Sequence, residues 1–190
     1  MRRAPACGRR PRSSTRCAAR GTGRPVPEAS GATRRPPGLD SPTVKKLLKR
    51  VSRSQVWLYR RTNGRVGGTW RVGAGFRKPV PVLLLDHLGR RSGRLFTTPL
   101  LYLEDGSDVV VVASQGGMAA HPQWYRNLVA SPDTQVQIGP ELRLVTARVA
   151  EPAERERLWP LLDELYADFA DYRSWTDREI PVVVLEPRAR

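Results

Sequence analysis

The first apolar pattern in the chain has helical spacing. Apolar or amide side chains recur every three or four residues, with lysine and arginine on the other face (Val44, Leu47, Leu48, Val51, Gln55, Leu58). Ser41 and Pro42 are typical of a helix start, and Asn63 and Gly64 of a helix end. We expect one amphipathic helix over residues 41–63. Such a basic helix can lie on a membrane surface, but packing on the protein's own sheet gives the same pattern and is favoured.

Short apolar runs separated by glycine and proline fill most of the remaining chain, and they predict strands. The expected strands cover residues 80–86, 95–103, 108–114, 135–138, 142–149 and 181–185. Helices are expected at 122–130 and from Pro152 onward, with a kink at Pro160. Pro99 places the second strand at an edge or a bulge. Hairpin-connected strands with helices at the ends and in one crossover predict a mainly β fold, a small antiparallel barrel with flanking helices.

Positive charge is concentrated at the N-terminus. The 190 residues have a formal net charge of +15, and the first 40 contain ten arginines but only two acidic residues. This segment has few large apolar residues, so it cannot offset its ordering entropy. We therefore predict a disordered basic tail over 1–40 and a single folded domain over 41–190. The tail could bind nucleic acid or an anionic membrane. We favour the alternative that it is upstream sequence without a role, which a start codon assigned too early would add.

Residue usage disfavours several classes of site. Cys7 and Cys17 both lie in the tail, so the folded domain has neither a disulfide nor a cysteine metal site, which fits a cytosolic protein. With His87 and His121 as the only histidines, we expect no metal centre. Serine-hydrolase, Walker and dinucleotide glycine motifs are missing. No apolar run approaches the ~20 residues of a membrane span, so we expect a cytoplasmic protein whose only membrane contact would be peripheral, at the inner face.

A cationic turn over residues 89–94 (Gly-Arg-Arg-Ser-Gly-Arg) is the most distinctive chemical feature. It joins two apolar runs, so three guanidiniums crowd one hairpin tip, where like charges repel. The glycines beside them would let backbone N–H groups turn outward. An anion, above all a phosphate, held by guanidiniums and backbone donors explains the pattern. A solvated basic turn is the alternative, and the turn alone does not decide between them.

Two further segments contain candidate ligand-binding residues. Residues 114–117 (Ser-Gln-Gly-Gly) follow a central strand, and their glycines would let a ligand approach backbone N–H groups, although an ordinary loop has the same composition. Residues 121–128 place Trp124 and Tyr125 on a short helix just after that loop. Trp124 would serve as core, as a cavity wall or as both.

An aromatic row follows near the C-terminus. Tyr166, Phe169 and Tyr172 recur every three residues, which places them along one helical face. Core packing is the ordinary explanation, but the acidic residues around them indicate a row that is partly exposed. Such a row suits a wall for a flat, apolar substrate or a conjugated ring.

Taken in order, these blocks resemble the deazaflavin-dependent nitroreductase family of actinobacteria. The matching stretch runs from residue 54 to residue 187 and contains the segments 89–93, 99–100, 113–117 and 121–128, and Tyr172 with 176–181. The resemblance implies a split β-barrel, like that of the FMN-binding oxidoreductases. It also implies coenzyme F-420 as the cofactor, an 8-hydroxy-5-deazaflavin that bears a phosphate and a polyglutamate tail.

The resemblance implies which residues would contact the coenzyme. The turn would bind the phosphate and the acidic tail: Arg90, Arg91, Ser92, Gly93 and Arg94. The strand after it would flank the ring and its linker: Thr97, Thr98, Pro99, Leu100, Leu101 and Tyr102. Hydrogen bonds to the ring would come from Ala113, Ser114, Gln115 and Gly116, and the ribityl phosphate and ring edge would be enclosed by Trp124, Tyr125, Arg126, Asn127 and Leu128. Tyr166, Phe169 and Tyr172 would line the substrate side.

The implied reaction is hydride transfer from reduced coenzyme F-420 to an electron-poor acceptor, a quinone first and nitroaromatics second. No protein nucleophile is needed, because the chain only holds ring and acceptor together and excludes water. Tyr172 is the candidate catalytic donor to the acceptor oxygen, and Ser114 the second. An FMN enzyme or flavin-binding module on the same barrel is the alternative. Nucleic-acid binding through the tail is a remote one, because no recognition helix or stacking platform is evident.

Two positions depart from the family pattern. Relatives commonly have an arginine where this chain has Phe96, so one anion contact is lost, and a charged hydrogen bond is typically ~1.5–3 kcal/mol. Phe169 stands where relatives often have tyrosine, which removes a hydroxyl from the substrate wall. The first change would weaken coenzyme binding, and the second leaves the substrate open. The sequence does not reveal the oligomeric state.

Overall fold

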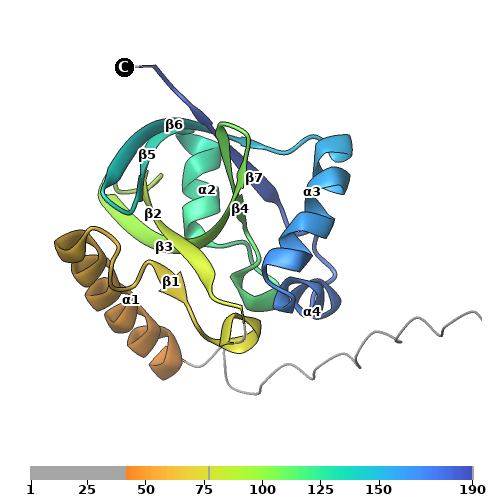
Figure 1. Cartoon of the computed structure of the whole chain (residues 1–190), viewed down its shortest axis with the longest axis horizontal. Helices are drawn as coiled ribbons and strands as arrows, with labels where there is room; N and C mark the ends of the chain where they lie inside the picture. Colours follow the sequence, from red (N-terminus) through yellow and green to blue (C-terminus); the bar gives the residue numbers. More distant parts are fainter. Residues whose placement is uncertain (1–41, 77, 190) are drawn as a thin grey trace, which may run out of the picture. The chain divides into compact units, whose positions relative to one another are not determined.

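The computed structural model describes residues 42–76 and 78–189, with side chains from Ser52 onward (Figure 1). The predicted tail and the predicted helix start at Ser41 lie outside these residues. In chain order the elements are α1 (Pro42–Thr62), β1 (Thr69–Trp70), the 3-10 helix η1 (Gly73–Phe76), β2 (Val80–Leu88), β3 (Leu95–Asp105), β4 (Asp108–Val112), the 3-10 helix η2 (Gln115–Gly117), α2 (Gln123–Ala130), β5 (Asp133–Ile138), β6 (Glu141–Val149), α3 (Pro152–Leu165), α4 (Asp168–Ser174) and β7 (Val182–Pro187).

The strands of the described residues form one antiparallel sheet in the order β1-β2-β3-β4-β7-β6-β5. β2 also pairs with β5, through Leu84 with Gln137 and Leu85 with Val136, and this pairing closes the sheet into a barrel. β1 pairs with the start of β2, so it takes the part of that edge that β5 leaves free. The predicted small antiparallel barrel is therefore confirmed, and closure leaves its six wall strands without long free edges.

Alternate residues of β4 and β7 face two different cores. Inside the barrel, α2 packs against one set: Val109, Val111, Val183 and Leu185. Outside the wall, α3 and α4 cover the other set: Val110, Val112, Val182 and Val184. Figure 1 shows α3 and α4 on one side of the barrel and α1 on the other. Because both faces of these strands are covered, their sequences are apolar without interruption over residues 109–112 and 182–185 and lack the alternation of a half-exposed strand.

The helix α1 packs on the barrel, as favoured from its sequence. Tyr59 is buried there, and its hydroxyl donates to the Val82 carbonyl and accepts from the Gly139 N–H, both at 2.9 Å. The chain leaves α1 through Asn63 and Gly64, which have φ of +50° and +78° and end the helix as predicted. No helix among the described residues is both long enough and apolar enough to span a bilayer.

The prolines inside elements sit differently from each other. Pro99 lies opposite Leu84 in the β2 ladder, and β4 pairs with β3 only from Tyr102 onward. At Pro99 the strand therefore has a partner on one side only, as expected of a residue that cannot donate. Pro160 lies within α3, which continues on both sides of it.

Candidate active site

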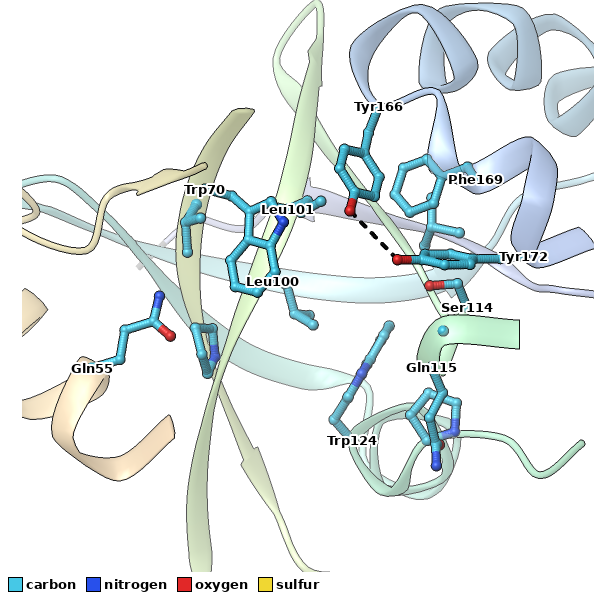
Figure 2. Close-up of a pocket in the computed structure, with 15 residues that line it drawn as sticks. Gln55, Trp70, Leu100, Leu101, Ser114, Gln115, Trp124, Tyr166, Phe169 and Tyr172 are labelled. Carbon is cyan, nitrogen blue, oxygen red and sulfur yellow. Dashed lines mark hydrogen bonds between the residues drawn. The ribbon is translucent and has the colours of Figure 1, made fainter. Parts of the chain in front are cut away.

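An apolar cavity of about 460 Å³ lies where β3, η2, α2 and α4 meet (Figure 2). Leu100 and Leu101 of β3 stand on one side of it, and Trp124 of α2 and Tyr172 of α4 on the other. Nearly all of the remaining lining is apolar or aromatic, from Trp70, Val82, Pro99, Val112, Pro122, Tyr166 and Phe169, with Gln55, Ser114, Gln115 and Gly116. A slot of this composition suits flat, apolar rings.

Three aromatic rings from the C-terminal helices form one wall of the cavity. Tyr166, Phe169 and Tyr172 have neighbouring ring centroids 5.2 to 6.2 Å apart, and the two tyrosine hydroxyls lie 3.4 Å apart (dashed line in Figure 2). The prediction of a partly exposed row on one helix is wrong for two members. Tyr166 and Phe169 are each 4% exposed because they also pack in the core under α3 and α4, and Tyr166 ends α3 while α4 begins at Asp168.

Burial also fixes the protonation of the two tyrosines. It raises the pKa of Tyr172 and of Tyr166 above the usual value for a phenol, because the ionised form loses its hydration. Both hydroxyls therefore keep their protons at neutral pH. Tyr172 can donate a hydrogen bond into the cavity, with Tyr166 behind it.

The loop that follows β4 has an unusual backbone. Gln115, Gly116 and Gly117 have successive φ of +49°, +61° and +69°, a region that only glycine adopts freely. A Cβ on Gly117 would lie 2.9 Å from the Tyr172 carbonyl oxygen, so the loop packs closely on α4. Ser114 is buried at the start of the loop and lines the cavity. The predicted segment thus lies beside the cavity, next to the helix of Tyr172.

A second cavity, of about 800 Å³, adjoins the first, because Gln115, Pro122 and Trp124 line both. Most of its other lining residues are polar or basic: Ser52, Arg53, His87, Arg90, Arg91, Ser92, Thr97, Thr98, Gln123 and Asn127, with Gly89 and Phe96. Together the two cavities form one cleft that is apolar at one end and basic at the other. The structure thus brings the turn next to the loop and the α2 segment, from which β3 and β4 separate it in the sequence.

The backbone of the cationic turn differs from the prediction. Five of its N–H groups already have acceptors: Gly89 (Arg94 O, 2.8 Å), Ser92 and Gly93 (Gly89 O, 3.0 and 2.7 Å), Arg90 (Asn127 Oδ1, 3.2 Å) and Arg94 (Ser92 Oγ, 3.4 Å). The expectation that these N–H groups turn outward to an anion is wrong, because they close the hairpin and fix it on α2. What the turn places at the cavity is therefore the side chains of Arg90 and Arg91, and the Arg90 guanidinium also donates to Gln123 Oε1 at 2.8 Å.

A buried histidine connects the turn to the barrel. Asn127 accepts from the Arg90 N–H through Oδ1, so its Nδ2 must donate to Nδ1 of His87, 2.9 Å away. His87 therefore has its proton on Nε2, which lies 3.0 Å from the Thr98 hydroxyl. Burial lowers the pKa of His87, more than the charge of Asp86 raises it, so the ring is neutral at pH 7.

Arg94 does not join the other two arginines. It lines a neighbouring groove of about 780 Å³ between α1 and β3, with Arg53, Arg60 and Arg61, and does not line the basic cavity. Arg53 lines this groove and also the basic end of the cleft. The predicted group of three guanidiniums is therefore divided, and an arginine from α1 stands at the cleft where Arg94 was expected.

An ion pair fixes α1 beside the basic end of the cleft. Arg60 contacts the buried carboxylate of Asp86 at 2.8 Å. The same carboxylate accepts from the Thr97 hydroxyl at 2.5 Å and the Gln135 amide at 2.8 Å. Asp86 thus has partners on three elements, which hold Arg53 of α1 at its place in the cleft.

Some predicted residues lie outside all three cavities: Gly93, Tyr102, Ala113, Tyr125, Arg126 and Leu128. Tyr102, Ala113 and Leu128 belong to the core inside the barrel. Conversely, the sequence did not point to Trp70, which comes from the segment before β2. Its position depends on the pairing of β1 with β2, for which a two-residue strand leaves no local pattern.

A closed barrel with a cleft that is apolar at one end and basic at the other is the architecture of a split-barrel oxidoreductase. The family model for F420H(2)-dependent quinone reductase matches residues 51–187, and the chain belongs to this family. The family resemblance and the predicted fold are therefore confirmed.

Relatives agree. Rv3178 of Mycobacterium tuberculosis, named provisionally as an F420H(2)-dependent quinone reductase, is 58% identical over 118 residues, 62% of this chain and 99% of that protein. Rv1261c of the same organism, named an F420H(2)-dependent quinone reductase, is 40% identical over 134 residues, 69% of this chain and 86% of that protein. A solved structure of an F420-H2 dependent reductase (FDR-A) has a TM-score of 0.53 at 40% identity and covers 56% of this chain and 94% of its own. Another, described as a domain-swapped dimer, has a TM-score of 0.56 at 31% identity, with 76% and 99% covered.

Proposed function

We propose that this chain reduces a quinone with reduced coenzyme F-420, and that the cleft is its active site. The observation that best supports the site is the continuity of an apolar cavity with an arginine-lined one in a member of this family. The apolar end has room and surface for flat rings, and the basic end has cations for an anionic side arm. Nitroaromatic compounds are proposed as secondary acceptors because they are also flat and electron-poor.

The residues of the cleft fit this coenzyme. Leu100, Leu101 and Trp124 offer apolar walls to the deazaflavin ring. The guanidiniums of Arg90 and Arg91 line the basic end, where forked donors suit a phosphate. When bound, the coenzyme supplies the hydride. The chain binds and orients the two reactants, and its apolar walls keep water from them.

Tyr172 is the proposed proton donor. A quinone that accepts a hydride also needs a proton on oxygen, and negative charge builds on that oxygen as the hydride arrives. The Tyr172 hydroxyl lines the apolar cavity and remains protonated, because burial raises its pKa. The neighbouring Tyr166 hydroxyl, 3.4 Å away, can hold its orientation. Ser114, on the same wall, is the second proposed donor.

A titration and one substitution test this proposal. Coenzyme F-420 is added to the purified chain while tryptophan fluorescence is followed, since Trp124 lies at the junction of the two cavities. Tyr172→Phe should then lower quinone turnover and leave the coenzyme dissociation constant unchanged. The matched control is Tyr59→Phe, which also removes a buried hydroxyl, but one that faces Val82 and Gly139. It should leave turnover unchanged.

Two results would contradict the proposal. If FMN binds and coenzyme F-420 does not, the cleft belongs to a flavin enzyme or flavin-binding module. If Tyr172→Phe turns over quinone at the rate of the unaltered chain, Tyr172 is not the donor, and the same measurement on Ser114→Ala then decides whether Ser114 is.

We also propose peripheral contact with an anionic membrane through the groove between α1 and β3, in a cytoplasmic protein. Trp57, Leu95 and Phe96 are 67%, 61% and 45% exposed there, beside the arginines of the groove. Exposed aromatic and apolar side chains with cations around them suit a lipid interface, where quinones also dissolve. The full chain should co-sediment with phosphatidylglycerol vesicles, and Trp57→Ala should weaken its vesicle binding several-fold. Equal sedimentation of both chains would contradict the contact.

A further inference from the structure

Arg178, which follows α4, has an unusual set of partners. Its guanidinium donates to five acceptors around η2: the carbonyl oxygens of Ala113, Ser114, Met118 and Glu179 at 3.0, 2.7, 2.8 and 3.3 Å, and Nδ1 of His121 at 3.2 Å. None of these five is charged. Burial lowers the pKa of Arg178, so its position costs hydration that these partners offset only by hydrogen bonds. A guanidinium has five donors spread over a rigid plane and can reach all five acceptors at once, whereas a lysine has three donors on one nitrogen and cannot span them.

The loop that Arg178 holds is the strained part of the cleft. Ala113 and Ser114 precede the left-handed residues that begin at Gln115, and Met118 follows them. One guanidinium therefore binds carbonyls on both sides of the strained stretch and closes it into a ring. A non-glycine residue such as Gln115 persists at φ +49° only when its surroundings impose that conformation.

The same contacts join the η2 loop to α4 on one side of the apolar cavity. Gly117 packs against the Tyr172 carbonyl from α4, and Arg178 reaches back to Ser114 from just beyond that helix. The loop is thus held between α4 and the segment after it. Its position relative to Tyr172 depends on both contacts.

We propose that Arg178 is a positioning residue, which closes the η2 loop through the fork of its guanidinium and so sets Ser114, Gln115 and Gly116 against the bound coenzyme ring. This inference rests on the proposed function of the cleft. This positioning role depends on the geometry of the guanidinium fork. The positive charge of Arg178 has a separate effect, which is to lower the pKa of the neighbouring His121.

Three variants distinguish the effect of the guanidinium fork from the effects of its charge and of general stability. Arg178→Lys keeps the charge without the fork, and Arg178→Met removes both. The control is Arg173→Met on α4, where the guanidinium pairs with Asp163 at 2.5 Å and stacks over Trp159 at 4.3 Å, away from the cleft. It should lower the melting temperature only.

Each variant is measured in three ways. Amide hydrogen exchange at Gly117 and Met118, whose N–H groups close the loop onto Ser114 and Gln115, is recorded without coenzyme. The coenzyme F-420 dissociation constant comes from tryptophan fluorescence. The pKa of His121 comes from NMR, where it is one of two histidines to assign. Burial, and then the charges of Arg178 and Arg126, lower this pKa in the unaltered chain.

The expected result is a split between the readouts. Both Arg178 variants should exchange faster at the loop and bind the coenzyme roughly ten- to a hundredfold more weakly, as small displacements of a positioning group do. Only Arg178→Met should raise the His121 pKa, because Arg178→Lys keeps the cation.

Three results would overturn the inference. The first is loop exchange and coenzyme affinity in Arg178→Lys equal to those of the unaltered chain. The second is the same equality in Arg178→Met. The third is unfolding of both variants while Arg173→Met folds, since Arg178 would then support the fold as a whole. If the unaltered chain binds no coenzyme F-420, the proposed function fails, and loop exchange in the free protein still tests the contact.

Discussion

The bond between Asn127 and His87 gives a sharp test of how the cationic turn is held. Asn127→Ala removes the donor to His87 Nδ1 and the acceptor of the Arg90 N–H. The ring nitrogen is buried, so leaving it without a partner should cost about 1–3 kcal/mol. The Arg90 N–H is near the surface, where water can replace the lost acceptor at little cost. For a domain of this size the loss corresponds to a fall of roughly 2–12 °C in melting temperature.

The direction in which stability changes with pH follows from the pKa of His87. In the unaltered chain burial lowers the pKa of His87, so the folded state resists protonation. Stability from the neutral ring is present above the unfolded pKa of about 6.5 and is lost as pH falls from there through the lower folded pKa. Asn127→Asp would instead place a carboxylate beside Nδ1 and raise the pKa of His87. Its stabilising contribution would be present at low pH and lost as pH rises.

Thermal unfolding at about pH 5.5 and about pH 8, on either side of the unfolded histidine pKa, is therefore the assay. Asn127→Asp should regain stability relative to the unaltered chain at the lower pH and lose it at the higher one. Asn127→Ala should be less stable at both. Coenzyme affinity should fall with Asn127→Ala, because the turn loses its link to α2. Equal melting of Asn127→Ala and the unaltered chain, or no crossing with Asn127→Asp, would refute the chain of bonds from Thr98 to the turn.

Three further outcomes follow from the structure. Gly117→Ala should impair coenzyme binding, because a Cβ there would lie 2.9 Å from the Tyr172 carbonyl oxygen. The control is Gly106→Ala, which has a similar φ of +65° in open space and should only lower the free energy of unfolding by about 1–2 kcal/mol. Equal coenzyme binding by both variants in a fluorescence titration would exclude the contact. Phe96→Arg should tighten coenzyme binding about tenfold at low salt, with the gain disappearing at high salt. Tyr59→Phe should cost about 1–2 kcal/mol in urea unfolding, since it leaves the Val82 carbonyl and Gly139 N–H unpaired, and an unchanged midpoint would contradict this.

Much of the fold follows from the sequence. The periodicities predict α1, the strands and α2 close to their observed bounds, because helix and strand repeats are local properties of the chain. The turn at 89–94 and the loop at 114–117 are visible as composition, and the order of the motif blocks indicates the family. What a local pattern cannot give is the partner that covers each face.

The tertiary structure decided the rest. Closure of β2 on β5 encloses one face of β4 and β7, and α3 and α4 cover the other. Pairing of β1 with β2 and the ion pair between Arg60 and Asp86 bring Trp70 and Arg53 to the cleft from segments with no chemical signature. Hydrogen bonds within the turn use the N–H groups that were predicted to turn outward, and Arg94 lines a different groove from Arg90 and Arg91. Apart from the hydrogen bonds within the turn, these outcomes depend on contacts between residues distant in sequence. Such contacts form only when the barrel closes, and they leave no repeat in the chain from which to predict them.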